Sequence, residues 1–261
     1  MIDKLKMVAK IVVFDSGLGS LSIIKEIQKI GKNDIVYFAD QKNYPYGVKS
    51  QAQLAIIIKK IINLLEEKFK PDIIVVASNT PSLMLDLSTK KIVDVKPPLK
   101  LAIKKSKSKR IGILATKSAI NSKGLVNYIK ENNIPKSYKI FKINGSNLVD
   151  LVESGKFLNK KKYCKKIIKK SLEQIITSEK IDTITLSSTH LLFLKLLLKK
   201  EFPEIQFIDP GKIIAKNIFL KIKNNQSKRN SLKIFTSGNV NNFKNKVNKI
   251  GIKNKVNFLS T

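Results

Sequence analysis

The chain has 261 residues, with 51 Lys and Arg against 19 Asp and Glu, which gives a formal net charge of +32. Hydrophobic residues make up 43% and charged residues 27%, which is typical of a globular protein and too apolar for a disordered chain. No apolar run is long enough to span a bilayer, and the first ten residues lack the apolar core of a signal peptide. One cysteine, Cys164, and one histidine, His190, exclude an internal disulfide and a multi-cysteine or multi-histidine metal site. We therefore expect a cytoplasmic protein without a metal.

The basic excess raises the question of a nucleic-acid partner, because lysine and arginine neutralise phosphates. Only Arg110 and Arg229 are arginines, however, and the lysines are scattered among many Ile and Asn residues. The densest runs, 104–110 and 160–170, are expected to be a loop and a solvated helix face. Solvated charge is therefore favoured over a nucleic-acid function, and no membrane partner is expected. The positive field is compatible with a small acidic substrate.

Short β-branched runs alternate with amphipathic helical patterns along the whole chain. An amphipathic helix is predicted after Gly19, another over 50–68, and a third around Ile168 and Leu172. The helix over 50–68 has a wide apolar stripe made of Leu54, Ile57, Ile58, Ile61, Ile62 and Leu65. This alternation predicts an α/β architecture with mostly parallel sheets. In chain order, the predicted strands cover 11–14, 34–38, 73–77, 92–95, 111–115, 140–143, 183–186, 206–208 and 233–235.

A weak internal echo links the two halves of the chain. The strand at 11–14 leads to Asp15 and Ser16, as the strand at 111–115 leads to Thr116. The strand at 73–77 runs into the triplet 78–80, as the strand at 183–186 runs toward the triplet 188–190. Polar residues just past the carboxyl ends of parallel strands are where α/β sheets bind ligands, so the echo predicts two lobes facing a cleft.

Each polar segment also has a purely structural interpretation. The segment 15–20 could bind an anion, or it could be a tight turn in which Asp15 or Ser16 caps the next helix. A dinucleotide fingerprint would need a glycine where the chain has Ser22. The triplets at 78–80 and 188–190 could equally be helix caps, although their equivalent places favour a site. Cys164, among lysines, is expected to be a bystander on a helix.

Taken together, segments spread along the chain resemble the glutamate racemases of the cofactor-independent aspartate/glutamate racemase superfamily. The resemblance runs in order over nearly the whole chain, and the ordered set is far more specific than any one piece. Its segments are 13–21, 37–40, 45–47, 75–80, 111–116, 186–190, 208–209 and 235–238.

The resemblance implies two pseudo-symmetric α/β lobes with mostly parallel sheets and an active-site cleft between them. The first lobe would comprise 1–98 and 209–261, and the second 99–208. It implies interconversion of L- and D-glutamate by two-base proton transfer without a cofactor or metal, D-glutamate serving peptidoglycan synthesis. The expected partner is a small acidic amino acid, and a homodimer is compatible with the family. Substrate contacts would fall on Asp15, Ser16, Tyr46, Gly47, Asn79, Thr80, Thr116, Thr189 and His190.

The chain departs from the family pattern where the chemistry is concentrated. The family has one cysteine per lobe, in an A-C-N-T and a G-C-T-H segment, and both positions are serine here, Ser78 and Ser188. By resemblance the catalytic residues are these two serines with Asp15 and His190 assisting them. A thiol has a pKa near about 8.5, whereas a serine hydroxyl is a far weaker acid that needs an adjacent base. Further departures are Ser20 and Ser187 in place of glycine, Ala119 in place of threonine, and Leu191-Leu192 in place of Tyr-Pro.

Three hypotheses follow. The chain could be an amino-acid racemase that uses its serines, or a catalytically inactive homologue that binds a small acid for a regulatory purpose. It could also be a repurposed hydrolase in which His190 activates Ser188. The last is ranked lowest, because residues two apart at a strand end need not face each other.

Overall fold

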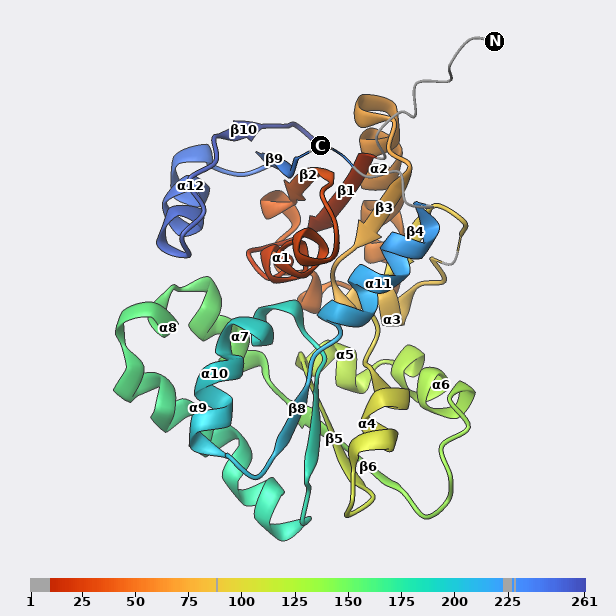
Figure 1. The fold of residues 1–261 in the computed structure, drawn as a ribbon, viewed down its shortest axis with the longest axis vertical. Coiled ribbons are helices and arrows are strands. Elements are labelled where there is room, and N and C mark those ends of the chain that lie inside the picture. Colours follow the sequence, from red (N-terminus) through yellow and green to blue (C-terminus); the bar gives the residue numbers. More distant parts are fainter. Residues whose placement is uncertain (1–9, 88, 223–226, 228) are drawn as a thin grey trace.

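The computed structural model describes residues 10–87, 89–222, 227 and 229–261, and its strands form two separate parallel sheets, one above the other in Figure 1. The predicted α/β class with parallel sheets is confirmed. The expectation about a signal peptide falls mostly on residues 1–9, outside the described part. The six-stranded sheet contains β1 (Lys10–Asp15), β2 (Asp34–Ala39), β3 (Ile73–Val76), β4 (Ile92–Asp94), β9 (Ser231–Thr236) and β10 (Val256–Phe258). The four-stranded sheet contains β5 (Arg110–Ala115), β6 (Lys139–Asn144), β7 (Thr183–Leu186) and β8 (Gln206–Ile208).

Four neighbouring strands of the larger sheet, β2-β1-β3-β4, have the same order as the four strands of the smaller sheet, β6-β5-β7-β8. The larger runs β10-β9-β2-β1-β3-β4 and the smaller runs β6-β5-β7-β8, so β1 and β3 hold the same relative places as β5 and β7. All strand pairs are parallel, and β9 returns the end of the chain to β2. The internal echo of the sequence therefore coincides with a repeated topology. The lobe boundaries at 98/99 and 208/209 stay a prediction.

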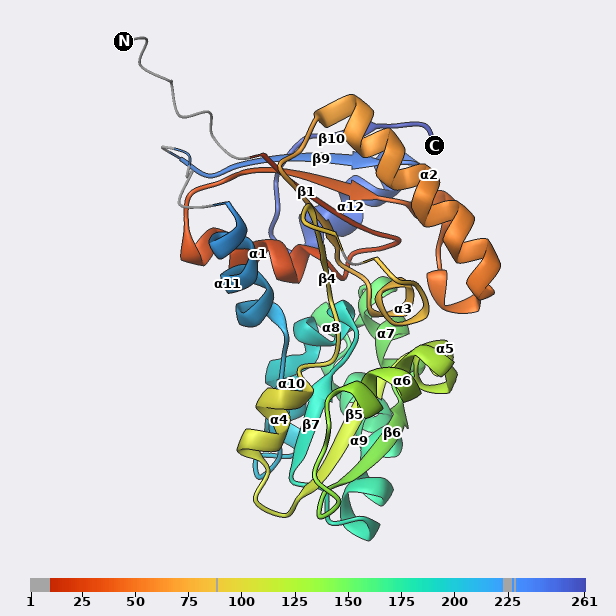
Figure 2. The same cartoon turned by 90° about the vertical axis from the view of Figure 1, so that its right-hand side faces the viewer.

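Helices cover both faces of each sheet (Figures 1 and 2). In the larger sheet, Ile11 and Val13 point toward α1, α11 and α12, while Val12 and Phe14 point toward α2, as the alternation of a strand requires. In the smaller sheet, α7, α9 and α10 cover one face and α4, α5 and α6 the other. The helices of the larger sheet are α1 (Leu21–Ile30), α2 (Gln51–Phe69), α3 (Asn79–Met84), α11 (Gly211–Lys221) and α12 (Val240–Lys249). Those of the smaller are α4 (Leu99–Lys105), α5 (Lys117–Asn121), α6 (Lys123–Glu131), α7 (Ser146–Glu153), α8 (Lys156–Asn159), α9 (Lys161–Ser178) and α10 (Lys195–Glu201). Short 3₁₀ helices η1 (Gln41–Asn43), η2 (Tyr46–Val48) and η3 (Thr189–Leu194) lie in loops.

Several local predictions need correction. Cys164 lies on a helix, α9, as predicted, although its lysine neighbours gave no sign that its side chain is fully buried against Ile168 and Leu172 in the core of the smaller sheet. The lysine-rich run at 104–110 is only partly a loop, since α4 extends to Lys105 and β5 begins at Arg110. Strand β10 was not predicted, because three residues between polar neighbours give too short a pattern to read.

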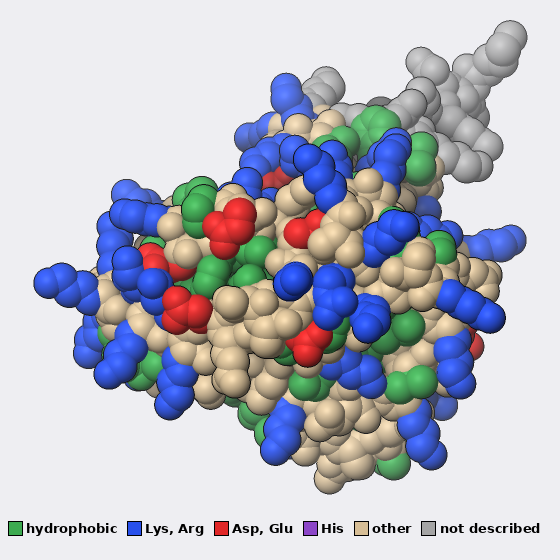
Figure 3. All heavy atoms as spheres, turned by 90° about the horizontal axis from the view of Figure 1, so that it is seen from below, with side chains coloured by type: hydrophobic (Ala, Val, Ile, Leu, Met, Phe, Trp, Pro, Cys, Tyr) green, Lys and Arg blue, Asp and Glu red, His purple; other side chains and the backbone are tan. Residues whose placement is uncertain are grey.

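Charge and membrane features follow the composition. Figure 3 shows lysine and arginine side chains spread over the whole of one face, with acidic side chains among them, instead of gathered into a single patch. Within the described ranges, no helix is long and apolar enough to cross a membrane.

Candidate functional site

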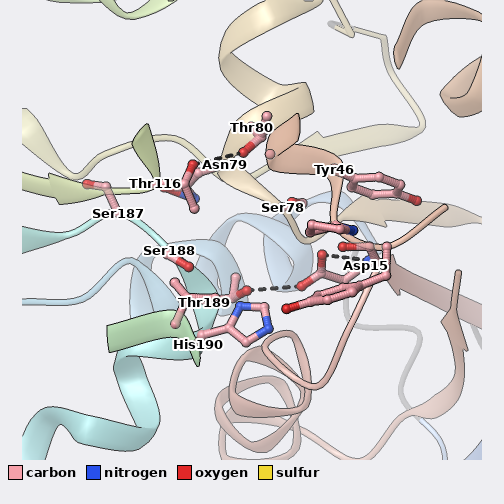
Figure 4. Close-up of a pocket in the computed structure, with 15 residues that line it drawn as sticks. Asp15, Tyr46, Ser78, Asn79, Thr80, Thr116, Ser187, Ser188, Thr189 and His190 are labelled. Atoms are coloured by element: carbon pink, nitrogen blue, oxygen red, sulfur yellow. Dashed lines mark hydrogen bonds between the residues drawn. The ribbon is translucent and has the colours of Figure 1, made fainter. Parts of the chain in front are cut away.

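Polar side chains from both sheets surround one cavity at the facing carboxyl ends of β1, β3, β5 and β7 (Figure 4). All residues that the sequence analysis singled out as site candidates line it. The cavity also contacts four residues that were not predicted, Tyr44, Pro45, Val149 and Ser187. Its volume is about 60 Å³, which holds only a few water molecules. The full lining is Asp15, Ser16, Tyr44, Pro45, Tyr46, Gly47, Ser78, Asn79, Thr80, Thr116, Val149, Ser187, Ser188, Thr189 and His190.

Ser78 and Ser188 occupy equivalent positions on opposite sides of this cavity. Ser78 follows β3 and precedes α3, and Ser188 follows β7 and precedes η3. Both have the extended backbone of a capping residue, yet neither side chain forms a capping hydrogen bond. The interpretation of these serines as side-chain caps is therefore wrong, and their hydroxyls face the cavity uncommitted to a helix end. Thr116 does cap α5, through the N–H of Ala119.

Asp15 is a buried carboxylate at the end of β1. It accepts hydrogen bonds from the N–H of Ser16 at 2.7 Å and from the hydroxyl of Thr189 at 3.1 Å, and the second bond joins the two sheets. Burial raises the pKa of Asp15 to about 6, against the opposing effect of the His190 charge and these two bonds. Neither Asp15 nor Ser16 caps α1, which begins at Leu21 after Ser20, so that alternative is wrong.

His190 is held by a residue that the sequence analysis missed. Its Nε2 lies 2.7 Å from Oε1 of Glu153, the last residue of α7, and both side chains are buried. Burial acts to lower the pKa of His190, but the hydrogen bond and charge of Glu153 raise it. Burial acts to raise the pKa of Glu153, but His190, the N–H of Leu18 and Lys246 lower it to about 2. The ionised glutamate therefore favours the protonated form of His190. Among the acidic residues, nothing in the sequence marks Glu153, because its partners come from distant segments.

Two glycines in the loop after β1 make room for this pair. A Cβ at Gly17 would lie 2.1 Å from Oε1 of Glu153, and one at Gly19 would lie 2.3 Å from Oγ1 of Thr189 and 2.6 Å from Nδ1 of His190. No side chain fits at such distances, so the glycines are needed for the close approach of the two sheets. Neither glycine has a positive φ, so the need is for space and not for an unusual backbone conformation.

The other end of the cavity is lined by neutral groups. Nδ2 of Asn79 donates to the carbonyl of Val95 at 2.8 Å, and Oδ1 of Asn79 is buried with no partner among the described residues. The hydroxyls of Thr80 and Thr116 meet across the two sheets at 3.3 Å. Tyr46 donates to Oδ2 of Asp40 at 3.0 Å, which fixes its ring beside the cavity, and burial raises the pKa of Tyr46.

The site offers hydrogen bonds, one cation and one carboxylate. In the part of the chain that the structure describes, no group of three or more His, Cys, Asp or Glu side chains is placed to hold a metal ion. The arrangement can bind a small polar molecule that carries both an ammonium group and carboxylates. It also places one hydroxyl on each side of that molecule.

Glutamate racemases are found among both the sequence relatives and the similar solved structures. No family model matches the chain. The glutamate racemase of Buchnera aphidicola subsp. Schizaphis graminum is 34% identical over 227 residues, covering 84% of this chain and 88% of that protein. The structure of a glutamate racemase isoform from Bacillus anthracis superposes with a TM-score of 0.83 at 24% identity, covering 97% of both chains. The Escherichia coli glutamate racemase, solved with L-glutamate and an activator, gives a TM-score of 0.80 at 22% identity, covering 97% of this chain and 98% of that one.

Proposed function

The chain belongs to the glutamate racemase family, and we propose that it binds glutamate in the cavity between its two sheets, with exchange of the α-proton strongly reduced because serine replaces both cysteines. The observation that carries this proposal is the placement of Ser78 and Ser188. They follow equivalent strands of the two sheets and approach one cavity from opposite sides. A two-base reaction needs one proton-transfer group on each side of the ligand, and here a weakly acidic hydroxyl stands at each position in place of a thiol.

The cavity chemistry suits an acidic amino acid. The buried, unpartnered Oδ1 of Asn79 is an acceptor for an ammonium group. His190, whose protonated form Glu153 favours, and the hydroxyls of Thr80 and Thr116 are donors for carboxylates. The net charge of +32 increases the local concentration of small anions around the molecule. Glutamate is the ligand we assign, because the E. coli relative was solved with L-glutamate.

The cavity is poorly equipped for the proton-transfer step. Removal of the α-proton requires a base, and a serine hydroxyl at neutral pH supplies almost no alkoxide unless a neighbouring base takes its proton. His190 is poorly suited to serve Ser188 in this way, because its Nε2 is engaged by Glu153 and that carboxylate favours the protonated imidazole. For the same reason the hydrolase hypothesis is not favoured. Asp15 is the remaining base in the cavity, and its carboxylate already accepts two hydrogen bonds.

The test compares binding and exchange in the same protein. Calorimetry would measure the Kd for L- and D-glutamate, and NMR in heavy water would follow loss of the α-proton signal. We expect saturable binding by the natural chain and exchange that rises by about 10²–10⁴-fold in the S78C/S188C double variant. The S78A/S188A variant is the matched control, which has the same small side chains and no hydroxyl or thiol.

Each outcome decides the proposal. Absence of glutamate binding overturns it. Exchange by the natural chain as fast as by S78C/S188C shows that hydroxyls suffice, and the chain is then a glutamate racemase, for which family membership implies D-glutamate supply to peptidoglycan. Binding without exchange, with thiols restoring exchange, supports a glutamate-binding protein that has lost its acid and base.

A further inference from the structure

Lys246 lies on α12, outside the cavity. A single side chain, that of Glu153, connects it to the His190 imidazole. The Lys246 Nζ is 3.2 Å from Oε2 of Glu153, while Oε1 of the same carboxylate is 2.7 Å from Nε2 of His190. The three side chains therefore form one chain of charges, Lys246–Glu153–His190. Glu153 and His190 are buried, and the Lys246 side chain is 37% exposed.

Glu153 is one of the residues through which the two sheets are joined. It belongs to α7, which packs on the four-stranded sheet together with η3 and His190. Its other partners come from the six-stranded sheet, the N–H of Leu18 at 2.7 Å from Oε1 and the ammonium of Lys246 at Oε2. Each carboxylate oxygen thus has a donor from across the gap.

The place of Glu153 favours a second cation beside its carboxylate. It is the last residue of α7, where the free carbonyl groups of the helix carry partial negative charge and disfavour a carboxylate. Within the described part, Lys246 is the side chain that donates to Oε2. Without it, a nearly buried carboxylate oxygen would lose its hydrogen-bond partner, and the carboxyl plane could turn away from the geometry that His190 needs.

We propose that Lys246 is a positioning residue of the cavity: by holding Oε2 of Glu153 it fixes the carboxylate that orients His190, and it ties the two sheets together behind the cavity. The inference extends the proposed function to a residue outside the cavity, and its effect on ligand binding rests on that function.

The cross-sheet contact has a consequence for ligand binding. The cavity is lined by residues of both sheets, so ligand binding depends on how closely the two sheets approach each other. Contacts that span the gap, such as Lys246–Glu153, then favour the closed arrangement around the ligand. Loss of Lys246 should weaken glutamate binding without removing any group from the cavity wall.

His190 is the only histidine in the chain, so its NMR signal reports on this site without assignment. The test labels histidine with ¹³C in the full chain, without a histidine tag, and follows the titration midpoint of His190 in K246M, K246R and K244M. Lys244 lies on the same helix and is exposed, so K244M makes the same change in net charge away from Glu153. Calorimetry measures the glutamate Kd of each variant.

In K246M we expect the His190 midpoint to fall by about half a pH unit, because a Glu153 carboxylate that turns away no longer accepts the hydrogen bond that stabilises the imidazolium. Loss of the Lys246 charge without any change in Glu153 would raise the midpoint instead. The glutamate Kd should rise by about fivefold. K246R should restore both values, and K244M should match the natural chain. A K246M midpoint and Kd equal to those of K244M, or a midpoint that rises, would overturn the inference. If the natural chain binds no glutamate, the proposed function fails, and the midpoints alone still decide the role of Lys246.

Discussion

The two ends of the cavity are built on different principles. At one end, Asp15, Glu153 and His190 are buried, and His190 pairs with Glu153 at 2.7 Å. Two further bonds cross between the sheets, from the N–H of Leu18 to Glu153 at 2.7 Å and from the hydroxyl of Thr189 to Asp15 at 3.1 Å. At the other end, Asn79, Thr80 and Thr116 are neutral, and the hydroxyl contact between the sheets is 3.3 Å long. The first end is a closed network and the second retains free hydrogen-bonding capacity.

This difference separates stability from ligand binding. Breaking a buried ion pair leaves an uncompensated charge, so changes at the charged end should affect folding most. A neutral hydroxyl contact contributes little to folding, so changes at the hydroxyl end should affect ligand affinity with small effects on folding.

The largest expected effect is that of E153Q. It leaves His190 buried without its anion, and we expect a loss of about 4 kcal/mol in the free energy of unfolding. The folded pKa of His190 lies above its ordinary value of 6.5, so the contribution of the pair is complete below that pH and is lost as pH rises through the folded pKa. At the acid end it is lost as pH falls through about 2, the pKa of Glu153.

Urea unfolding at pH 5.5 and pH 9 checks this, with a larger difference at pH 5.5. E179Q is the control, because Glu179 also pairs with a cation, Arg110, but its side chain is 39% exposed. Equal losses for the two variants would show that burial does not distinguish the charged end.

Removing the charge of Asp15 should have the opposite effect to E153Q and increase the free energy of unfolding. Its pKa is raised to about 6, so its ionised form costs stability above that pH, and the cost declines as pH falls toward 4. We expect D15N to raise the free energy of unfolding by about 3 kcal/mol at pH 8 and by much less at pH 4. Thermal unfolding at both pH values measures this. A destabilised D15N at pH 8 would mean that the carboxylate is stabilised by its bonds more than burial disfavours it.

The glycines extend the comparison to backbone packing. A Cβ at Gly19 meets Thr189 and His190 below 3 Å, so G19A should cost about 2 kcal/mol through overpacking. At the hydroxyl end a Cβ at Gly47 comes no closer than 3.3 Å, to Oγ of Ser118, and G47A should be nearly neutral. Differential scanning calorimetry of the two variants makes the comparison, which fails if G47A is the more damaging.

The smallest stability effect is expected for T80V, which keeps the shape of the side chain and removes the hydroxyl. The long contact with Thr116 predicts a change below about 1 kcal/mol in unfolding. Glutamate affinity should nevertheless fall by about tenfold, because a donor for the ligand carboxylate is lost. Calorimetric titration and urea unfolding of the same sample test both. An unchanged Kd would place the ligand away from the hydroxyl end.

The strands and the long helices were readable from the sequence because their apolar residues follow the periods of a strand or helix. Strand β1 was predicted within one residue at each end, and α2 has its four buried residues among the six predicted for its apolar stripe. Ile57 and Ile62 of that stripe are only partly buried, because a helix on one sheet face buries a narrower band than the pattern spans. Helices α11 and α12 were not predicted individually, since lysine and asparagine interrupt their apolar patterns.

The residues of the site also fall into those that the sequence revealed and those that it did not. Asp15, Ser78, Thr116 and Ser188 were found from the sequence because each lies at the end of a readable strand or within two residues of it. Parallel strands bring their carboxyl ends to one edge of the sheet. Glu153 and Lys246 were not found, because each lies on a helix with no local feature that distinguishes it from other charged residues. Their pairing joins positions 93 residues apart and depends on how two sheets face one another.

The sequence by itself determined the α/β class, the repeated strand-and-turn pattern and the polar residues at the strand ends, because these follow from local periodicity and turn chemistry. Only the tertiary structure decided which of those residues are charged, which are hydrogen-bonded across the gap and which stay free. Those properties depend on burial and on partners from distant segments, and a local pattern carries no information about either.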